Sequence, residues 1–379
     1  LKSWDIVDEL SDQFPQLLDR MAAYVPHITK PDGRIVPIGD TPTDLELTYY
    51  KDLLAPYFAR IPGLKALVTD SASARMREGA TVFKDEGYVV IRDNDSGRLA
   101  PAESGYLFFT AGAHAGRGHR QADDLSFTLS IMGRDLFVDS GVYSYKIDAA
   151  RAFVLSPAAH NTVEVDGQSY GGWDTVLESV ETNPGIILIR ASHRNYPGFE
   201  HRRSLVYARP FLLFVIDTVN RYGASLAASD SGNGYSFKQF FQLAPDTSPA
   251  IDGVGVNIWA PVDRTDRKQV IARLIPLTKL NRAPRIARGD RDPMAGWYSA
   301  RHGQLTAAPA LIFEQMGQEA LFVTAVEIAS NRSVGESTKV AQGQYQARRS
   351  GNALALEWVT EGKIQSLRID TATHARIRD

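Results

Sequence analysis

Three side chains stand out as able to do chemistry together: His119, Asp139 and His160. Two neutral imidazoles and one carboxylate form a common three-ligand set for Zn²⁺, with a fourth position left for water or substrate. The same residue types could transfer protons instead, since the reference pKa of histidine lies near neutrality. The chain contains no HExxH segment and no EF-hand loop, so the spacing alone does not identify a metal site. A purely structural role, with a loop cap, a strand end and a hydrogen-bonded core histidine, stays open at this point.

A hairpin over residues 125–141 is expected to position these groups. In LSFTLSI, apolar side chains alternate with Ser and Thr, which is typical of a strand with one face in a core. Residues 132–134 supply the turn, and RDLFVDSG runs back as the partner strand. Pairing outward from this turn places Asp139 near Thr128 and His119 just beyond the open end of the hairpin.

His160 has two candidate roles. As a zinc ligand its imidazole is neutral and committed to the metal, whereas as a free base at the start of NTVEVDG it would exchange a proton. In the second case Asn161 would orient the ring or donate to a substrate carboxylate. We favour ligation because His119 and Asp139 alone make a poor zinc site. His114, in a glycine-flanked loop, is a rival ligand.

Several other residues are candidates for a catalytic cleft. Tyr143 and Tyr145 could supply a phenol, although strand tyrosines often pack with only the hydroxyl at the rim. Arg151 could bind a carboxylate bidentately, and a surface ion pair explains it equally well. Of the two acids that follow a glycine turn, Asp44 fits helix capping, so Asp40 is the better candidate for the cleft.

The segment HRNYPGFEHRR (193–203) concentrates basic residues around aromatic ones. His193, Arg194 and His201 are its candidates for binding an acidic glycan. The alternative is a solvated hairpin end, which the same composition also fits.

The composition excludes several classes of protein. With 44% hydrophobic and 23% charged residues, the 379-residue chain is typical of a globular protein with a buried core. Its formal net charge of −2 argues against general nucleic-acid binding. No apolar run approaches the roughly 20 residues that a membrane span needs. The absence of cysteine excludes disulfides, thiolate nucleophiles and cysteine-ligated zinc.

The chain divides into a helical segment over residues 1–80 and a β region over residues 81–379. Apolar residues recur at helical spacing in the first segment, where we expect one helix ending near Pro26, a second over 44–60 capped by Thr43, and a weaker third capped by Gly79. Beyond residue 80 the period becomes two, and about fifteen strands follow without intervening helices. This pattern predicts a mostly β protein made of stacked antiparallel sheets.

The stretch HRQADDLSFTLSIMGRDLFVDSGVYSY, followed by RAFVLSPAAHNTVEVDG, resembles the C-terminal region of the heparinase II/III-like polysaccharide lyases. The shared pattern is H-x-x-x-D-x-x-x-F, a glycine-centred turn, D-x-G-x-Y-x-Y, an arginine loop and H-N-T. Here it falls on His119, Asp123, Phe127, Gly133, Asp139, Gly141, Tyr143, Tyr145, Arg151, His160, Asn161 and Thr162. DGRIVPIGD (32–40) is similar to the loop before the last helices of the family's incomplete (α/α) toroid, so the resemblance covers nearly the whole chain.

The resemblance implies both a fold and a chemistry. It implies a β-sandwich over residues 81–379, with Zn²⁺ bound by His119, Asp139 and His160, and β-elimination on a polysaccharide that contains uronate. A base removes the proton α to the uronate carboxylate, and an acid protonates the leaving glycosidic oxygen. The family's Asn/His pair and main catalytic Tyr lie on toroid helices without a counterpart in residues 1–80. We therefore expect this chain to carry the sandwich half of an active site.

Substrate, location and assembly are broader expectations. The resemblance implies a bacterial enzyme, periplasmic or secreted, that acts on an acidic polysaccharide such as a glycosaminoglycan or alginate. Because the chain begins at Leu1 without an initiator Met or a signal pattern, we expect a piece of a longer protein, and whether it is active without its upstream helices is left open. A homo-oligomer is left open. The competing hypothesis is a non-catalytic carbohydrate-binding or structural β-sandwich.

Overall fold

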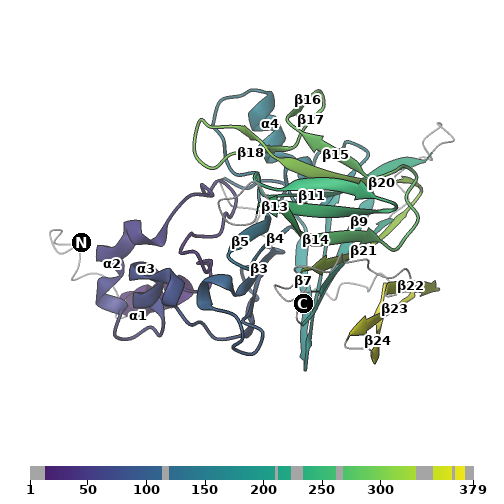
Figure 1. Cartoon of the computed structure of the whole chain (residues 1–379). Coiled ribbons are helices and arrows are strands. Elements are labelled where there is room, and N and C mark those ends of the chain that lie inside the picture. Colours follow the sequence, from purple (N-terminus) through teal and green to yellow (C-terminus); the bar gives the residue numbers. More distant parts are fainter. Residues whose placement is uncertain are drawn as a thin grey trace.

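The computed structural model describes residues 13–112, 119–209, 212–222, 234–261, 268–329, 345–360 and 363–371. Helices α1, α2 and α3 gather at one end of the molecule, whereas α4 lies among the strands that make up the rest (Figure 1). The helices are α1 (Gln13–Tyr24), η2 (Leu47–Tyr50), α2 (Lys51–Leu54), η3 (Ala55–Tyr57), α3 (Leu64–Thr69), η4 (Ser71–Ser73), η5 (Pro101–Glu103), α4 (Ala149–Leu155) and η6 (Pro157–Ala159), where η denotes 3₁₀. None of these described helices is both long and apolar enough to span a membrane.

The helices before β1 are shorter and more broken than the sequence predicts. The expected helix over 44–60 is divided into η2, α2 and η3, and Pro56 lies at the start of η3, where a proline cannot continue a helix from the preceding turn. Thr43 does not cap a helix; its hydroxyl lies 2.7 Å from that of Tyr298, far along the chain. Similarly, α3 ends at Thr69, and Gly79 begins a strand rather than capping a helix. Apolar residues of η2, α2 and α3 meet in a small core of their own, whereas Leu17 and Met21 of α1 are exposed.

A five-stranded sheet follows the helices. Its order is β1 (Gly79–Phe83), β2 (Tyr88–Asp93), β3 (Gly105–Thr110), β4 (Phe127–Ile131) and β5 (Arg134–Phe137), and every neighbouring pair is antiparallel. The predicted hairpin is therefore present as β4 and β5. Ile131 pairs with Arg134, but a bulge after Leu129 shifts the register and pairs that residue with Phe137.

An eight-stranded antiparallel sheet forms the centre of the β region (Figure 1). Its order is β12 (Ser248–Asp252), β13 (Gly255–Pro261), β14 (Lys268–Pro276), β21 (Ala320–Ile328), β10 (Leu212–Arg221), β9 (Phe199–Ala208), β8 (Ile186–Tyr196) and β7 (Thr175–Asn183). Against it lies a four-stranded sheet of β15 (Arg285–Arg288), β20 (Pro309–Gly317), β11 (Tyr235–Gln242) and β6 (Val163–Val165). Two short hairpins pair β16 (Asp290–Arg291) with β17 (Met294–Ala295) and β18 (Trp297–Tyr298) with β19 (Thr306–Ala307).

One large apolar core joins the three sheets, because it draws buried residues from all of them. Strand β9 is buried along its whole length, so its alternate residues serve two cores. Leu205 and Tyr207 enter the large core, while Val206 between them faces a second one.

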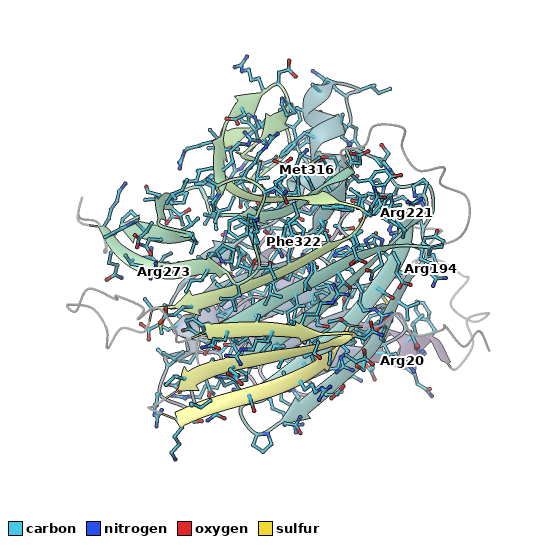
Figure 2. All side chains as sticks on the ribbon, turned by 90° about the vertical axis from the view of Figure 1, so that its right-hand side faces the viewer. Arg20, Arg194, Arg221, Arg273, Met316 and Phe322 are labelled. Carbon is cyan, nitrogen blue, oxygen red and sulfur yellow. The ribbon has the colours of Figure 1, made fainter. Side chains whose placement is uncertain are left out.

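A three-stranded sheet covers that second face. It comprises β22 (Tyr345–Ser350), β23 (Ala353–Thr360) and β24 (Lys363–Asp370), and Figure 2 shows these yellow strands lying across the central sheet. Leu354, Leu356 and Trp358 pack against Val206 and Phe214 of the sheet beneath. The prediction of a mostly β fold with stacked antiparallel sheets is thus confirmed, and the division into two domains at residue 80 stays a prediction.

Candidate active site

An exposed histidine and an exposed tyrosine meet at the junction between the helical segment and the sheets. The Nδ1 atom of His119 lies 3.2 Å from the hydroxyl of Tyr145, and the two rings meet edge to face. The side chain of His119 is 69% exposed and Tyr145 is 56% exposed. His119 also adopts a φ of 69°, a left-handed conformation that costs a non-glycine residue about 1–3 kcal/mol and is often retained at functional sites.

Behind this pair lies a buried carboxylate, Asp40, whose side chain is only 3% exposed. It accepts two hydrogen bonds from the Arg151 guanidinium, at 2.8 and 2.9 Å, and one from the Gln121 amide at 2.9 Å. Its Oδ2 atom also lies 3.1 Å from Nδ1 of His119. Burial alone would raise the pKa of Asp40, but the bonds from Arg151 and Gln121 and the charge of Arg151 outweigh it and lower the pKa.

Arg151 therefore binds a carboxylate bidentately, as the sequence predicts. That carboxylate is the protein's own Asp40 and not a group of the substrate. The residue lies in α4, where its backbone N–H donates to the side chain of the helix cap Asp148. Its guanidinium carbon lies 5.1 Å from the centre of the Tyr145 ring. Because both of its outer nitrogens donate to Asp40, the prediction that Arg151 clamps a substrate carboxylate is corrected.

The two candidate tyrosines have different surroundings. Burial of the hydroxyl and then the negative charge of Asp40 raise the pKa of Tyr145, against the opposing charge of Arg151. Tyr143 is half-buried, and its ring packs against the apolar cluster around α4 that contains Phe153. The structure thus brings only Tyr145 into the exposed cluster.

Asp139 and His160 form a separate, buried pair. The Nδ1 atom of His160 lies 2.7 Å from Oδ2 of Asp139, and the imidazole is fully buried. Burial would lower the pKa of His160, but the charge of Asp139 outweighs it and raises the pKa. The Val154 carbonyl adds to this rise, although no hydrogen bond of ordinary geometry reaches Nε2. Because the imidazole is fully buried, the prediction that His160 contacts substrate as a base is corrected.

The three residues predicted to bind zinc are not brought together. His119 lies with Asp40 and Tyr145 at the surface, whereas His160 and Asp139 pair in the interior. Within the described parts of the chain, no three His, Asp or Glu side chains converge as a metal site. His114, the rival ligand, lies outside the described residues. The described geometry does not fit the predicted ligand set, and zinc stays a prediction.

This geometry makes a prediction about metal content. We expect elemental analysis of chelator-free protein to give the same metal content for the wild type and for His119→Ala, because the His119 side chain is directed to Asp40 and Tyr145. His160→Gln serves as the matched variant, because it alters the buried pair that His160 forms with Asp139, the third predicted zinc ligand. Loss of a stoichiometric zinc in His119→Ala would instead support the ligand set implied by the resemblance.

Asn161 is a structural residue rather than a substrate ligand. It is fully buried, and its amide nitrogen donates to the carbonyls of Phe127, at 2.7 Å, and Val138, at 2.9 Å. Its side-chain oxygen accepts from the backbone N–H of Gln242 at 2.6 Å. The asparagine thus ties three segments together, which corrects the prediction that it contacts substrate.

The prediction that the basic segment 193–203 binds an acidic glycan is also corrected for its two histidines. His193 and His201 have no exposed surface, and they contact each other at 3.1 Å within the central sheet. His201 further contacts Asp217 at 2.7 Å. Of the three candidates only Arg194 is partly exposed, and it pairs with Glu200 at 2.9 Å. Neither histidine can touch a glycan from this position.

Sequence reasoning missed two residues of this site, one buried and one exposed. Gln121 is buried beside Asp40, and its position between the two fixed residues of H-x-x-x-D was the available signal. His302 lies with its ring centre 5.9 Å from that of Tyr145. No local pattern singles out His302, because it reaches the cluster from a distant loop.

Comparison with known proteins gives consistent matches along the chain. A family model described as heparinase II/III-like, C-terminal, matches residues 75–344. The heparin-sulfate lyase of Bacteroides stercoris is 23% identical over 221 residues, covering 55% of this chain and 32% of the relative. The heparin-sulfate lyase of Pedobacter heparinus is 26% identical over 141 residues, covering 36% of this chain and 20% of the relative.

Solved structures share the fold. Heparan sulfate lyase HepC from Pedobacter heparinus superposes with a TM-score of 0.76 at 19% identity, covering 99% of this chain and 56% of that one. A heparinase III gene product gives a TM-score of 0.75 at 17% identity, covering 97% of this chain and 54% of that one. The chain thus spans about half the length of these structures and less than a third of the curated relatives that it matches.

Proposed function

Since the family model covers most of its length, the chain belongs to the heparinase II/III-like family, and we propose that it supplies the sandwich half of a polysaccharide lyase active site. The proposed reaction is β-elimination on an acidic polysaccharide that contains uronate. A base takes the proton α to the carboxylate, and the electrons of that C–H bond form a C=C bond. The glycosidic C–O bond breaks, and its oxygen leaves with a proton from an acid.

The observation that carries this proposal is the exposed pair of His119 and Tyr145 above a buried carboxylate. In the described part of the chain, no residue forms a hydrogen bond with Nε2 of His119, and the side chain is 69% exposed, so this nitrogen is available to accept a proton. The Tyr145 hydroxyl lies beside His119 at the same exposed surface, and a phenol is one of the groups that donate protons in general acid catalysis. We assign no described residue to the substrate carboxylate, and no step passes through a metal.

The names of the curated relatives support a glycosaminoglycan of the heparan sulfate type as the first substrate to test, with alginate second. Such polymers do not cross a membrane freely, so we propose a periplasmic or secreted location. The substrate contacts of the whole enzyme would be completed by residues outside the described site.

The direct test is the absorbance that elimination creates. We expect the full-length protein, mixed with heparan sulfate, to raise absorbance near the ultraviolet edge as conjugated unsaturated uronate forms. His119→Gln or Tyr145→Phe should lower the rate by roughly 10²–10⁴, which is what a positioned acid or base contributes. Tyr143→Phe is the matched control, because that ring packs against α4 and lies outside the exposed cluster.

Two results would overturn the proposal. Equal rates in His119→Gln and the wild type would remove His119 from the chemistry. Retention of acidic polysaccharide without any rise in absorbance, across heparan sulfate and alginate, would favour a carbohydrate-binding module instead of an enzyme.

A further inference from the structure

We propose that Asp40 is a positioning residue that fixes the proton of His119 on Nδ1 and so leaves Nε2 as the proton acceptor. This inference rests on the proposed function and deepens it. It assigns to the segment of residues 28–47, here called the arm, the role of delivering a carboxylate to a site whose other members lie among the strands.

The hydrogen-bonding chemistry of Asp40 supports this role. An ionised carboxylate can only accept hydrogen bonds, and the bonds from Arg151 and Gln121 hold Asp40 in that form. The nitrogen of His119 that faces it at 3.1 Å must therefore carry the proton. Because a neutral imidazole has one N–H, the exposed Nε2 is then the basic nitrogen.

The same arrangement constrains the Tyr145 hydroxyl. Its oxygen lies 3.2 Å from Nδ1 of His119. Since Nδ1 carries its proton and directs it at Asp40, the phenol cannot donate to that nitrogen, and the Asp40 carboxylate also interacts with the hydroxyl and raises its pKa. A single buried carboxylate thereby leaves Nε2 as the acceptor of the exposed pair.

Asp40 acts through His119 and does not touch substrate. Its side chain is 3% exposed, and Arg151, Gln121 and His119 surround both of its oxygens. A carboxylate so enclosed has no lone pair directed at solvent. The structure therefore separates Asp40, which orients, from His119, which would react.

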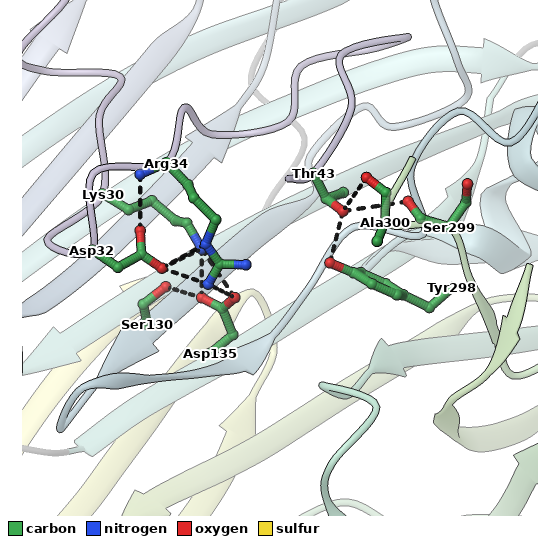
Figure 3. A network of polar contacts seen from close by, with 9 residues as sticks. All are labelled: Lys30, Asp32, Arg34, Thr43, Ser130, Asp135, Tyr298, Ser299 and Ala300. Carbon is green, nitrogen blue, oxygen red and sulfur yellow. Dashed lines mark hydrogen bonds and ion pairs between the residues drawn. The ribbon is translucent and has the colours of Figure 1, made fainter. Parts of the chain in front are cut away.

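Figure 3 shows the contacts that hold the arm at Lys30 and Arg34, before Asp40 in the chain, and at Thr43, after it. On one side Lys30 donates to both oxygens of Asp135, at 2.7 and 2.9 Å, and Arg34 donates to the same carboxylate at 2.9 Å. On the other side the Thr43 hydroxyl lies 2.7 Å from that of Tyr298. Two contacts, one ionic and one neutral, thus fix the arm to β5 and to β18.

The turn between these contacts touches His119 directly. The backbone N–H of Asp40 donates to the carbonyl of His119 at 3.1 Å. Gly39 precedes it with a φ of 53°, and a β-carbon there would lie 2.5 Å from the same carbonyl oxygen. Only glycine permits this approach, which places both the backbone and the carboxylate of the turn against His119.

Asp40→Asn in the full-length protein is the test, because the amide keeps the shape of the side chain and places an N–H₂ group where Nδ1 needs an acceptor. We expect kcat to fall by about 10²-fold, at the lower end of what positioned proton transfer contributes, with KM changed less than threefold. In ¹⁵N-histidine NMR above neutral pH, we expect His119 to change from the Nδ1–H tautomer to the Nε2–H tautomer.

Asp44→Asn is the matched control. It lies on the same arm but pairs at the surface with Arg301, at 2.8 Å, so we expect its kcat and its His119 tautomer to equal those of the wild type. Assignment of the His119 signals uses His119→Gln.

The outcomes separate this inference from the proposed function. A wild-type His119 in the Nε2–H tautomer would overturn the inference, whether or not Asp40→Asn folds. Unchanged kcat in a folded Asp40→Asn variant would also overturn it. If the wild type lacks lyase activity altogether, the proposed function fails, while the tautomer measurement still decides the role of Asp40.

Discussion

Replacing Arg203 by Met is expected to lower the free energy of unfolding by about 3–5 kcal/mol, the usual cost of removing one partner of a buried ion pair. Arg203 and Asp217 have no exposed side-chain surface. Arg203 donates to both carboxylate oxygens, at 2.7 and 2.8 Å, and to the carbonyl of Leu125 at 2.7 Å. Methionine would fill part of the space but leave the Asp217 carboxylate in the core without its cation. Denaturant unfolding at neutral pH measures the loss.

Arg282→Met is the control, since Arg282 is 74% exposed and its pair with Glu314, at 3.4 Å, lies at the surface. An exposed pair contributes about 0–1 kcal/mol. A loss of similar size in both variants would contradict the assignment of the buried pair as the stabilising one.

The pH dependence of the Arg203→Met deficit has a defined sign. Burial would raise the pKa of Asp217, but the charges of Arg203 and His201 outweigh it and place the pKa well below its usual range. The stabilisation is therefore fully present above the unfolded pKa of about 3.9 and is lost as the pH falls from there through the folded pKa. In Arg203→Met the carboxyl protonates more readily, so the difference from the wild type should narrow below about pH 4.

The second large effect is expected for Asn161→Leu, at about 3 kcal/mol or more. The substitution leaves the carbonyls of Phe127 and Val138 and the N–H of Gln242 without their partner. Each buried group left unpaired costs roughly 1–3 kcal/mol. Thermal unfolding at neutral pH is the measurement.

Asn257→Leu is the matched control for this prediction. Its amide donates to Asp252 at 3.1 Å on an exposed hairpin, and surface changes of this kind usually stay within about 0.5 kcal/mol. If Asn161→Leu also stayed within that range, Asn161 would not be the tie between segments that its contacts indicate.

Local patterns in the sequence were sufficient to predict the β4–β5 hairpin. The alternation in residues 127–131 defined the buried face, and Met132 and Gly133 adopt φ values of 54° and 73°, as a tight turn between paired strands requires. The bulge after Leu129 could not be predicted, because it depends on neighbours from other strands rather than on the hairpin's own residues.

Pairings between distant segments account for the predictions that were wrong. Thr43 has the residue type and position of a helix cap, yet its partner is Tyr298. Arg151 has the type of a substrate clamp, yet its partner is Asp40, 111 residues earlier in the chain. Residue type and spacing identify what a side chain can bind, whereas the tertiary fold determines which partner it meets.

The sheet formed by β22, β23 and β24 determines where this chain can be truncated without exposing its core. The family match ends at residue 344, and β22 begins at Tyr345. Yet Trp358 and its neighbours share an apolar core with Phe214 inside the matched region. Truncation at residue 344, where the family match ends, would therefore uncover one apolar face of the central sheet and favour aggregation. We expect a protein that extends through Asp370 to unfold at a higher temperature than one that ends at residue 344.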